Sequence, residues 1–116
     1  MASRRYMPHK LTDMKNIFDT IPENIDTEII EKIVDYENVK IERIISKGHT
    51  SPDTGWYDQA ENEWVLVLKG EAVLQFTDGS TLPMKAGDHI NIAAHKKHRV
   101  QWTAPDTETI WLAVFY

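Results

Sequence analysis

The stretch that decides the fold runs from Glu63 to Phe76 and reads EWVLVLKGEAVLQF. In a strand, successive side chains point to opposite faces, and in the first half of this stretch the side chains of both faces are apolar. One set is Val65 and Val67, and the other consists of bulkier residues: Trp64, Leu66 and Leu68. A strand that is apolar on both sides belongs inside a sandwich or barrel, or beneath a partner subunit.

Further short β-rich runs lie on both sides of this stretch: VKIERII (39–45), HINIA (89–93), HRVQW (98–102) and TIWLAVF (109–115). Turn-forming residues separate these runs: Gly48, 52–55, Lys69-Gly70, Asp78-Gly79, Ala86-Gly87 and Ala104-Pro105. Short strands separated by such regular turns predict an all-β jelly-roll barrel rather than an α/β fold.

One helix is expected before the first strand, over about residues 27–36. Asp26 or Thr27 can cap its N-terminus. The apolar residues follow the i, i+1, i+4, i+5 spacing of a buried helical stripe: Ile29, Ile30, Ile33 and Val34. We therefore expect an N-terminal extension, residues 1–38, with this short helix packed outside a barrel domain of residues 39–116. Residues 1–15 predict a loosely ordered lead-in.

The overall composition is that of one ordinary soluble domain: 116 residues, 41% hydrophobic and 27% charged. The net charge of −5 argues against a nucleic-acid-binding protein. The absence of cysteine excludes disulfides, thiolate catalysis and iron–sulfur clusters. No apolar run is long enough for a membrane helix or a secretory signal, so we expect a cytoplasmic protein without a membrane partner.

Two spaced motifs resemble those of the cupin family. Glu63 is followed by six residues and Gly70, and Gly87-Asp88 is followed by nine residues and His98. Residues 39–116 are therefore similar to a small single-domain cupin, an RmlC-like jelly roll of the cupin-2 type found in an uncharacterised bacterial subgroup. The resemblance implies a double-stranded β-helix with one pocket inside it.

The cupin resemblance also implies a metal site of three His and one Glu, and this chain departs from it. The His-x-His pair is missing, and the aligned positions fall within 56–60, among Trp56, Tyr57, Asp58 and Gln59. Glu63 and His98 remain, and Asp58 or Gln59 could complete a shell for a divalent transition metal (Fe, Zn, Mn, Ni or Cu). The alternative is a hydrogen-bonded Glu63–His98 pair in a metal-free pocket.

The remaining polar and aromatic residues near the motifs have two interpretations each. Trp56, Tyr57, Asp58 and Gln59 could bind a ligand, with Gln59 donating hydrogen bonds and Trp56 stacking, or they could form a structural turn. Tyr57 with His98 could also supply acid–base chemistry, as the pair does in cupin sugar epimerases. Among the remaining histidines, His49 and His89 are expected in exposed positions, and His95 is expected in a loop at the mouth of the barrel.

Three classes of function remain open. The first is a metal-dependent cupin acting on a small polar metabolite, and the second is a metal-free module that binds or senses a small molecule. The third is an interaction protein whose pocket is filled by side chains. Because strand 63–68 and the run IWLAVF are more apolar than a small barrel interior needs, we also expect a homodimer.

Overall fold

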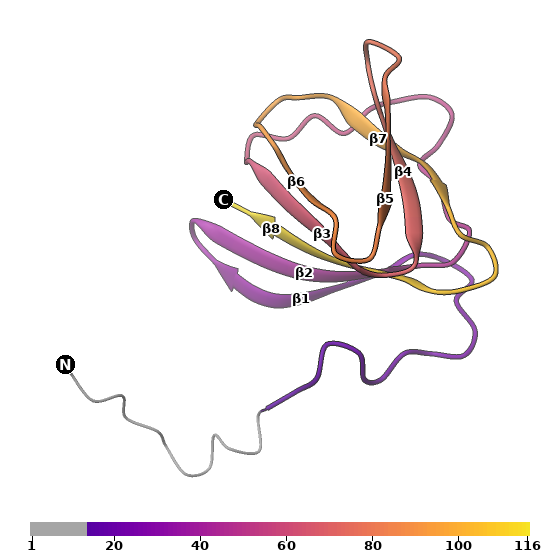
Figure 1. Ribbon diagram of the computed structural model, residues 1–116. Coiled ribbons are helices and arrows are strands. Elements are labelled where there is room, and N and C mark those ends of the chain that lie inside the picture. Colours follow the sequence, from indigo (N-terminus) through magenta and orange to yellow (C-terminus); the bar gives the residue numbers. More distant parts are fainter. Residues whose placement is uncertain (1–13) are drawn as a thin grey trace.

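The computed structural model describes residues 14–116, and in this part of the chain the regular secondary structure is entirely β (Figure 1). The strands are β1 (Ile29–Tyr36), β2 (Val39–Ser46), β3 (Glu63–Lys69), β4 (Glu71–Phe76), β5 (Thr81–Lys85), β6 (His89–Ile92), β7 (His98–Thr103) and β8 (Thr109–Phe115). The all-β prediction is confirmed, and the lead-in of residues 1–15 lies almost wholly outside the described residues.

The strands form two antiparallel sheets that face each other. One has five strands in the order β1-β2-β8-β3-β6, and the other has three in the order β5-β4-β7. Most neighbours in a sheet are distant in sequence, as in a jelly roll, and Figure 1 shows the two layers. This topology brings the start of β3, the start of β7 and the end of β8 to the same end of the barrel.

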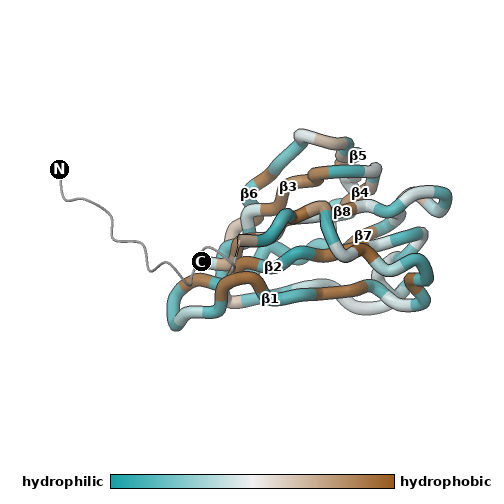
Figure 2. The backbone as a smooth tube through the Cα atoms, turned by 90° about the horizontal axis from the view of Figure 1, so that it is seen from below, coloured by the Kyte–Doolittle hydropathy of each residue, from teal (hydrophilic) through white to brown (hydrophobic). Residues whose placement is uncertain are grey.

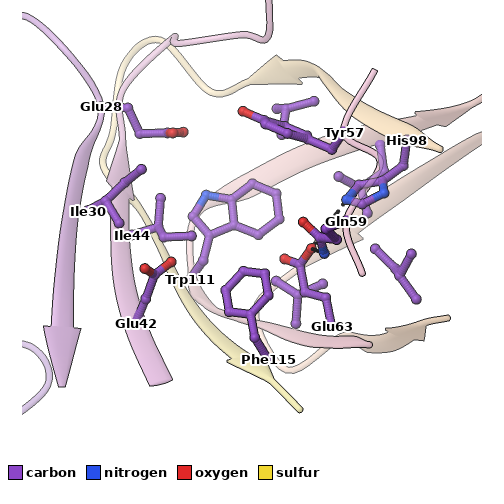
Figure 3. Close-up of a pocket in the computed structure, with 14 residues that line it drawn as sticks. Glu28, Ile30, Glu42, Ile44, Tyr57, Gln59, Glu63, His98, Trp111 and Phe115 are labelled. Carbon is purple, nitrogen blue, oxygen red and sulfur yellow. Dashed lines mark hydrogen bonds and ion pairs between the residues drawn. The ribbon is translucent and has the colours of Figure 1, made fainter. Parts of the chain in front are cut away.

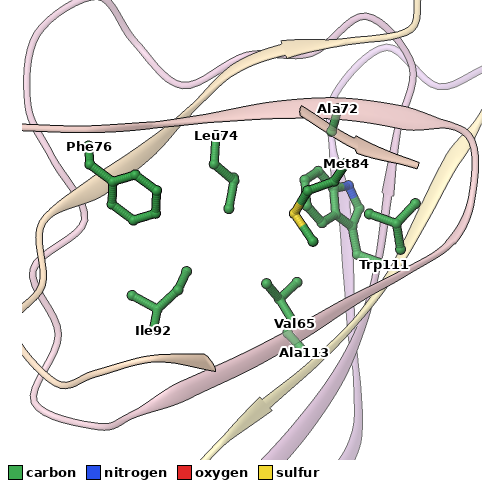
Figure 4. Packing of buried hydrophobic residues seen from close by; sticks show 9 residues of the cluster. Val65, Ala72, Leu74, Phe76, Met84, Ile92, Trp111 and Ala113 are labelled. Atoms are coloured by element: carbon green, nitrogen blue, oxygen red, sulfur yellow. The ribbon is translucent and has the colours of Figure 1, made fainter. Parts of the chain in front are cut away.

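The core lies between the sheets and draws on both of them (Figure 4). Its buried side chains are Val65, Val67, Ala72, Leu74, Phe76, Met84, Ile92, Trp111 and Ala113. Each fully buried aliphatic or aromatic side chain contributes about 1.5–3 kcal/mol relative to an exposed one. Figure 2 shows most hydrophobic stretches on the strands and mostly hydrophilic residues in the connecting loops.

The helix expected over residues 27–36 is not there, and that prediction is wrong. Most of this segment is strand β1, paired antiparallel with β2 from Ile29 to Tyr36. β-Branched side chains fit a strand well, which offsets their helical spacing. A bulge between Lys32 and Val34 inserts Ile33 and interrupts the alternation. Because of this inserted residue, the apolar side chains of the strand no longer recur at every second position, and their spacing resembles that of a helix.

Strand β5 is also absent from the elements expected from the sequence, because Pro83 lies in the middle of its five residues. β5 is the edge of the three-stranded sheet and pairs with β4 only. An edge strand tolerates a proline, since the missing N–H can face away from its neighbour.

The segment before β1 is fixed to the five-stranded sheet by one buried side chain. The Arg43 guanidinium donates to the main-chain carbonyls of Ile17 and Asp19, at 3.0 and 2.6 Å. It also forms an ion pair with Glu31 at 2.6 Å. Within residues 14–116 no helix has the length and hydrophobicity needed to cross a membrane.

Candidate functional site

A cavity of about 170 Å³ lies between the two sheets (Figure 3). Its wall is largely apolar, with a few polar groups: Glu28, Ile30, Glu42, Ile44, Tyr57, Gln59, Glu63, Val65, Leu74, Ile92, His98, Val100, Trp111 and Phe115. A cavity of about 150 Å³ accommodates a molecule the size of benzene, so this one suits a small ligand.

Glu63 and His98 form a buried pair at one side of this cavity. Glu63 is the first residue of β3 and His98 the first of β7, so the topology brings together residues 35 positions apart. His98 Nε2 lies 3.2 Å from Glu63 Oε1, and both side chains are close to nine-tenths buried or more. Gln59 donates its amide N–H to the same Glu63 oxygen at 2.9 Å. The sequence-predicted residues Gln59, Glu63 and His98 therefore form one hydrogen-bonded group.

The second ring nitrogen of His98 is also engaged, with Nδ1 lying 2.9 Å from the main-chain carbonyl oxygen of Lys96. Burial alone lowers the pKa of His98. The hydrogen bond to Glu63, the Lys96 carbonyl and the negative charge of Glu63 together outweigh burial and raise the pKa above its ordinary 6.5. Acceptors at both nitrogens stabilise the doubly protonated imidazolium relative to the neutral ring.

Tyr57 covers the pair from the loop before β3. Its main chain exchanges two hydrogen bonds with His98, at 2.8 and 3.2 Å. The Tyr57 and His98 rings are tilted, with centroids 5.6 Å apart. Figure 3 shows the Tyr57 hydroxyl directed away from His98 and toward the side of the cavity where Glu28 lies.

Glu28 and Glu42 bring two more carboxylates to the cavity. Glu28 precedes β1, and its Oε2 accepts a 2.8 Å hydrogen bond from the Ser46 hydroxyl. The same Ser46 oxygen accepts the indole N–H of Trp111 at 3.3 Å, so Trp111 and Ser46 together fix the position of Glu28. Glu42 lies on the inner side of β2, 3.8 Å from the ammonium of Lys40.

Other residues proposed from the sequence lie away from this group. Trp56 does not line the cavity, and the guanidinium of Arg99 stacks on its ring at 4.5 Å. Asp58 does not line it either, since its carboxylate contacts His95 Nδ1 at 2.8 Å in an exposed position.

Two further histidines have structural partners elsewhere. The His49 side chain receives the main-chain N–H of Lys47 at 2.9 Å and contacts the carbonyl oxygen of Asp26. The exposed His89 accepts the indole N–H of Trp64 at 3.2 Å.

Sequence reasoning missed Glu28 and Glu42 as cavity residues. The alternation in VKIERII carries a signal for Glu42, because it shares a strand face with Ile44, which points into the barrel. Glu28 carries no such signal. Its place depends on β1, which the sequence pattern assigns to a helix.

Comparison with known proteins identifies the family. The Cupin domain family model matches residues 43–115, which is more than half of the chain. The chain belongs to the cupin family. No curated protein matches it.

This cupin is similar in structure to "a putative mannose-6-phosphate isomerase" from Ralstonia eutropha JMP134, at 38% identity and a TM-score of 0.84, covering 88% of this chain and 95% of that one. It shares its fold with an RmlC-like cupin from Desulfovibrio desulfuricans (16% identity, TM-score 0.69, 88% and 94% covered). A cupin superfamily protein from Desulfitobacterium hafniense DCB-2 also has this fold (19%, 0.68, 82% and 82%).

Cupins often hold a divalent metal, and the donor set of this chain does not fit one. Among the described residues no group of three or more His, Asp or Glu side chains converges as metal ligands do. Glu63 and His98 bond to each other. The other two carboxylates of the cavity are engaged elsewhere, Glu28 with Ser46 and Glu42 with Lys40. Asp58, which the sequence suggested as a ligand, pairs with His95 instead. Protein metal sites with imidazole and carboxylate ligands use at least three protein donors as a rule.

Proposed function

We propose that this cupin binds a small polar molecule in its barrel pocket through the Glu63–His98 pair, without a divalent metal. The observation that carries the proposal is the 3.2 Å contact between His98 Nε2 and Glu63 Oε1. The two side chains that the family would direct at a metal instead neutralise each other. With His98 protonated, the pair has no net charge, and the two groups need no metal ion to balance them.

The pair leaves groups available to a ligand. Gln59 and Tyr57 line the cavity beside it, so a bound molecule can meet an amide, a phenol and a carboxylate while its apolar part contacts the wall. A mostly apolar pocket with a few convergent polar groups is the usual form of a small-molecule site. The expectation that Tyr57 and Gln59 contact ligand therefore has support from their position. Trp56 and Asp58, which lie outside the lining, have weaker support.

Elemental analysis and ligand titration together test the proposal. Protein purified without an affinity tag or chelator is expected to contain no metal above background. NMR titration with a panel of small polar molecules is expected to shift the Trp111 indole N–H and the His98 ring. Glu63→Gln and His98→Asn are expected to weaken these responses, whereas His89→Asn, on the exposed face of β6, leaves them intact. Near-stoichiometric metal that is lost in Glu63→Gln and His98→Asn would contradict the proposal.

A second candidate is a metal-independent isomerase that moves a proton along its substrate. The 38% identity to the Ralstonia protein favours it, together with the position of a carboxylate, an imidazole and a phenol around one cavity. Glu63 would accept a proton from carbon, and Tyr57 or His98 would protonate the neighbouring oxygen. Incorporation of solvent deuterium into a substrate, abolished in Glu63→Gln, would support it. Turnover without exchange would contradict it.

We infer that this protein assembles as a homodimer, and we expect it in the cytoplasm. β1 is an edge of the five-stranded sheet and exposes Ile30, Ile33 and Tyr36 at 56%, 50% and 76%. Exposed apolar edge strands favour pairing with a second copy. Sedimentation is expected to show a dimer at micromolar concentration. A monomer would contradict the inference.

A further inference from the structure

The charged residues of the cavity wall indicate which kind of ligand the cavity can bind. It contains three carboxylates, Glu28, Glu42 and Glu63, and neither lysine nor arginine is among the lining residues. Glu63 is paired with His98 and Glu42 with Lys40. Glu28 receives only a hydrogen bond from the neutral Ser46 hydroxyl among the described residues. Even with His98 protonated, the wall therefore keeps one uncompensated negative charge, at Glu28.

Aromatic rings lie in the same cavity wall as this charge. Tyr57, Trp111 and Phe115 line the cavity, and Figure 3 shows Trp111 between Glu28 on one side and Glu63 on the other. The hydrogen bonds from Trp111 to Ser46 and from Ser46 to Glu28 hold the carboxylate in a fixed position relative to the indole. The indole directs its N–H edge toward Ser46 and Glu28, and its ring lines the cavity beside them. Carboxylates and aromatic rings in one cavity wall both attract organic cations.

The chain itself provides an example of this recognition. The ammonium of Lys40 lies 4.6 Å from the centre of the Phe115 ring and 3.8 Å from Glu42, and both of these residues line the cavity. One carboxylate and one ring of the wall thus already bind an ammonium group. Glu28 with Trp111 offers a second carboxylate and ring in the same wall.

We propose that the ligand of this pocket is a small organic ammonium compound, whose cationic group pairs with Glu28 beside the aromatic rings of the wall. This inference rests on the proposed function, since it specifies the ligand class of the same cavity. The volume of about 170 Å³ corresponds to about six water molecules at about 30 Å³ each, which limits the ligand to a few non-hydrogen atoms. A sugar phosphate would place its anionic group near Glu28 without a lysine or arginine in the wall, so the wall disfavours it.

Isothermal titration of the full chain with three probes tests the charge requirement. The probes are choline, its neutral carbon isostere 3,3-dimethylbutan-1-ol, and mannose 6-phosphate. Choline is expected to bind about ten-fold more tightly than the neutral alcohol, and mannose 6-phosphate more weakly than either. Glu28→Gln keeps the side-chain shape and removes the charge, so it is expected to reduce the preference for choline to about two-fold or less. Glu71→Gln, an equal charge change on the exposed start of β4, is expected to leave the preference unchanged.

The possible negative results of this titration lead to different conclusions. Equal binding of choline and the alcohol, or a preference that persists in Glu28→Gln, would overturn the ammonium inference and leave the pocket a binding site for neutral molecules. Tighter binding of mannose 6-phosphate would overturn the inference as well while supporting a functional pocket. Absence of binding by all three would contradict the ammonium inference, and the proposed function would then be decided by the elemental analysis and the wider panel of polar molecules.

Discussion

The two ends of β3 differ in what their motif residues do. At one end, Gly70 packs so closely against β8 that an added Cβ would lie 2.5 Å from Thr109 Oγ1 and 2.7 Å from its Cα. At the other end, Glu63 directs a carboxylate into the barrel, where it meets His98 and Gln59 beside a cavity. The glycine of the Glu–six–Gly motif thus allows close backbone packing, whereas the glutamate belongs to a site whose protonation state and ligand occupancy can change. The two ends should therefore respond to mutation in different ways.

The largest effect on stability is expected from Gly70→Ala. The φ of Gly70 is 87°, a conformation that costs an L-residue about 1–2 kcal/mol, and the contacts with Thr109 and the Glu108 carbonyl oxygen add steric strain. We expect the free energy of unfolding in urea to fall by about 3 kcal/mol or more. Gly79→Ala is the matched control, since Gly79 has the same φ of 87° and nothing within 4 Å of the added Cβ. It should lose about 1 kcal/mol, and equal losses in both variants would contradict the packing role of Gly70.

Glu63→Gln is expected to lower the free energy of unfolding by less than Gly70→Ala does, and to change the titration of His98 measured by NMR. The variant loses a charged hydrogen bond to His98, which corresponds to about 2 kcal/mol. The pKa of His98 is expected to fall, because burial continues to lower it while the charge of Glu63 no longer raises it. NMR titration of the His98 ring measures this change, with His89→Asn as a control that leaves the His98 pKa in place. An unchanged His98 pKa in Glu63→Gln would show that the pair does not determine its protonation.

The pH dependence of stability should follow from the same pair. The folded-state pKa of His98 is raised above 6.5, so the folded protein holds this proton more tightly than the unfolded chain does. The contribution is fully present below the unfolded pKa and is lost as pH rises through the folded pKa. Urea unfolding between about pH 5.5 and 8.5 should therefore show the wild type losing its advantage over Glu63→Gln as pH increases. An advantage that grows with pH would contradict the assignment.

The smallest effect on stability is expected from Tyr57→Phe. The variant keeps the ring beside His98 and removes the hydroxyl that Figure 3 shows pointing into the cavity. Because Tyr57 is half exposed, we expect a change in unfolding free energy within about 0.5 kcal/mol. Affinity for a ligand that contacts the hydroxyl should fall about five-fold, as measured by the NMR titration. A large loss of stability would assign Tyr57 a structural role.

Much of the fold could be predicted from the sequence, because the buried strands are runs of mostly apolar and β-branched residues. The runs 63–68, 71–76 and 109–115 coincide with β3, β4 and β8 to within one residue. The two strands that the sequence did not predict are both sheet edges, where burial is weak and imposes less pattern on the sequence. β1 combines a bulge at Ile33 with half-exposed apolar residues, and β5 contains a proline.

The candidate site divides in the same way. Glu63, His98 and Gln59 could be found because two motifs and their spacing point to them. Glu28 could not, because its contribution depends on the pairing of β1 with β2. Trp56 and Asp58 adjoin the pocket residues in sequence, but the exposed loop directs them to Arg99 and His95. Sequence neighbours in a loop need not share a site, since no strand alternation fixes their directions.

The most direct test of a metal-free Glu63–His98 pair is the protonation state of the His98 ring with and without added metal. NMR of the ring nitrogens can follow both protons in chelator-treated protein and after addition of one equivalent of Zn²⁺ or Fe²⁺. We predict that His98 titrates with a pKa above 6.5, carries protons on both nitrogens at lower pH, and does so equally with and without metal. Loss of the Nε2 proton and of the titration on adding metal would contradict the account and assign the pocket to metal chemistry.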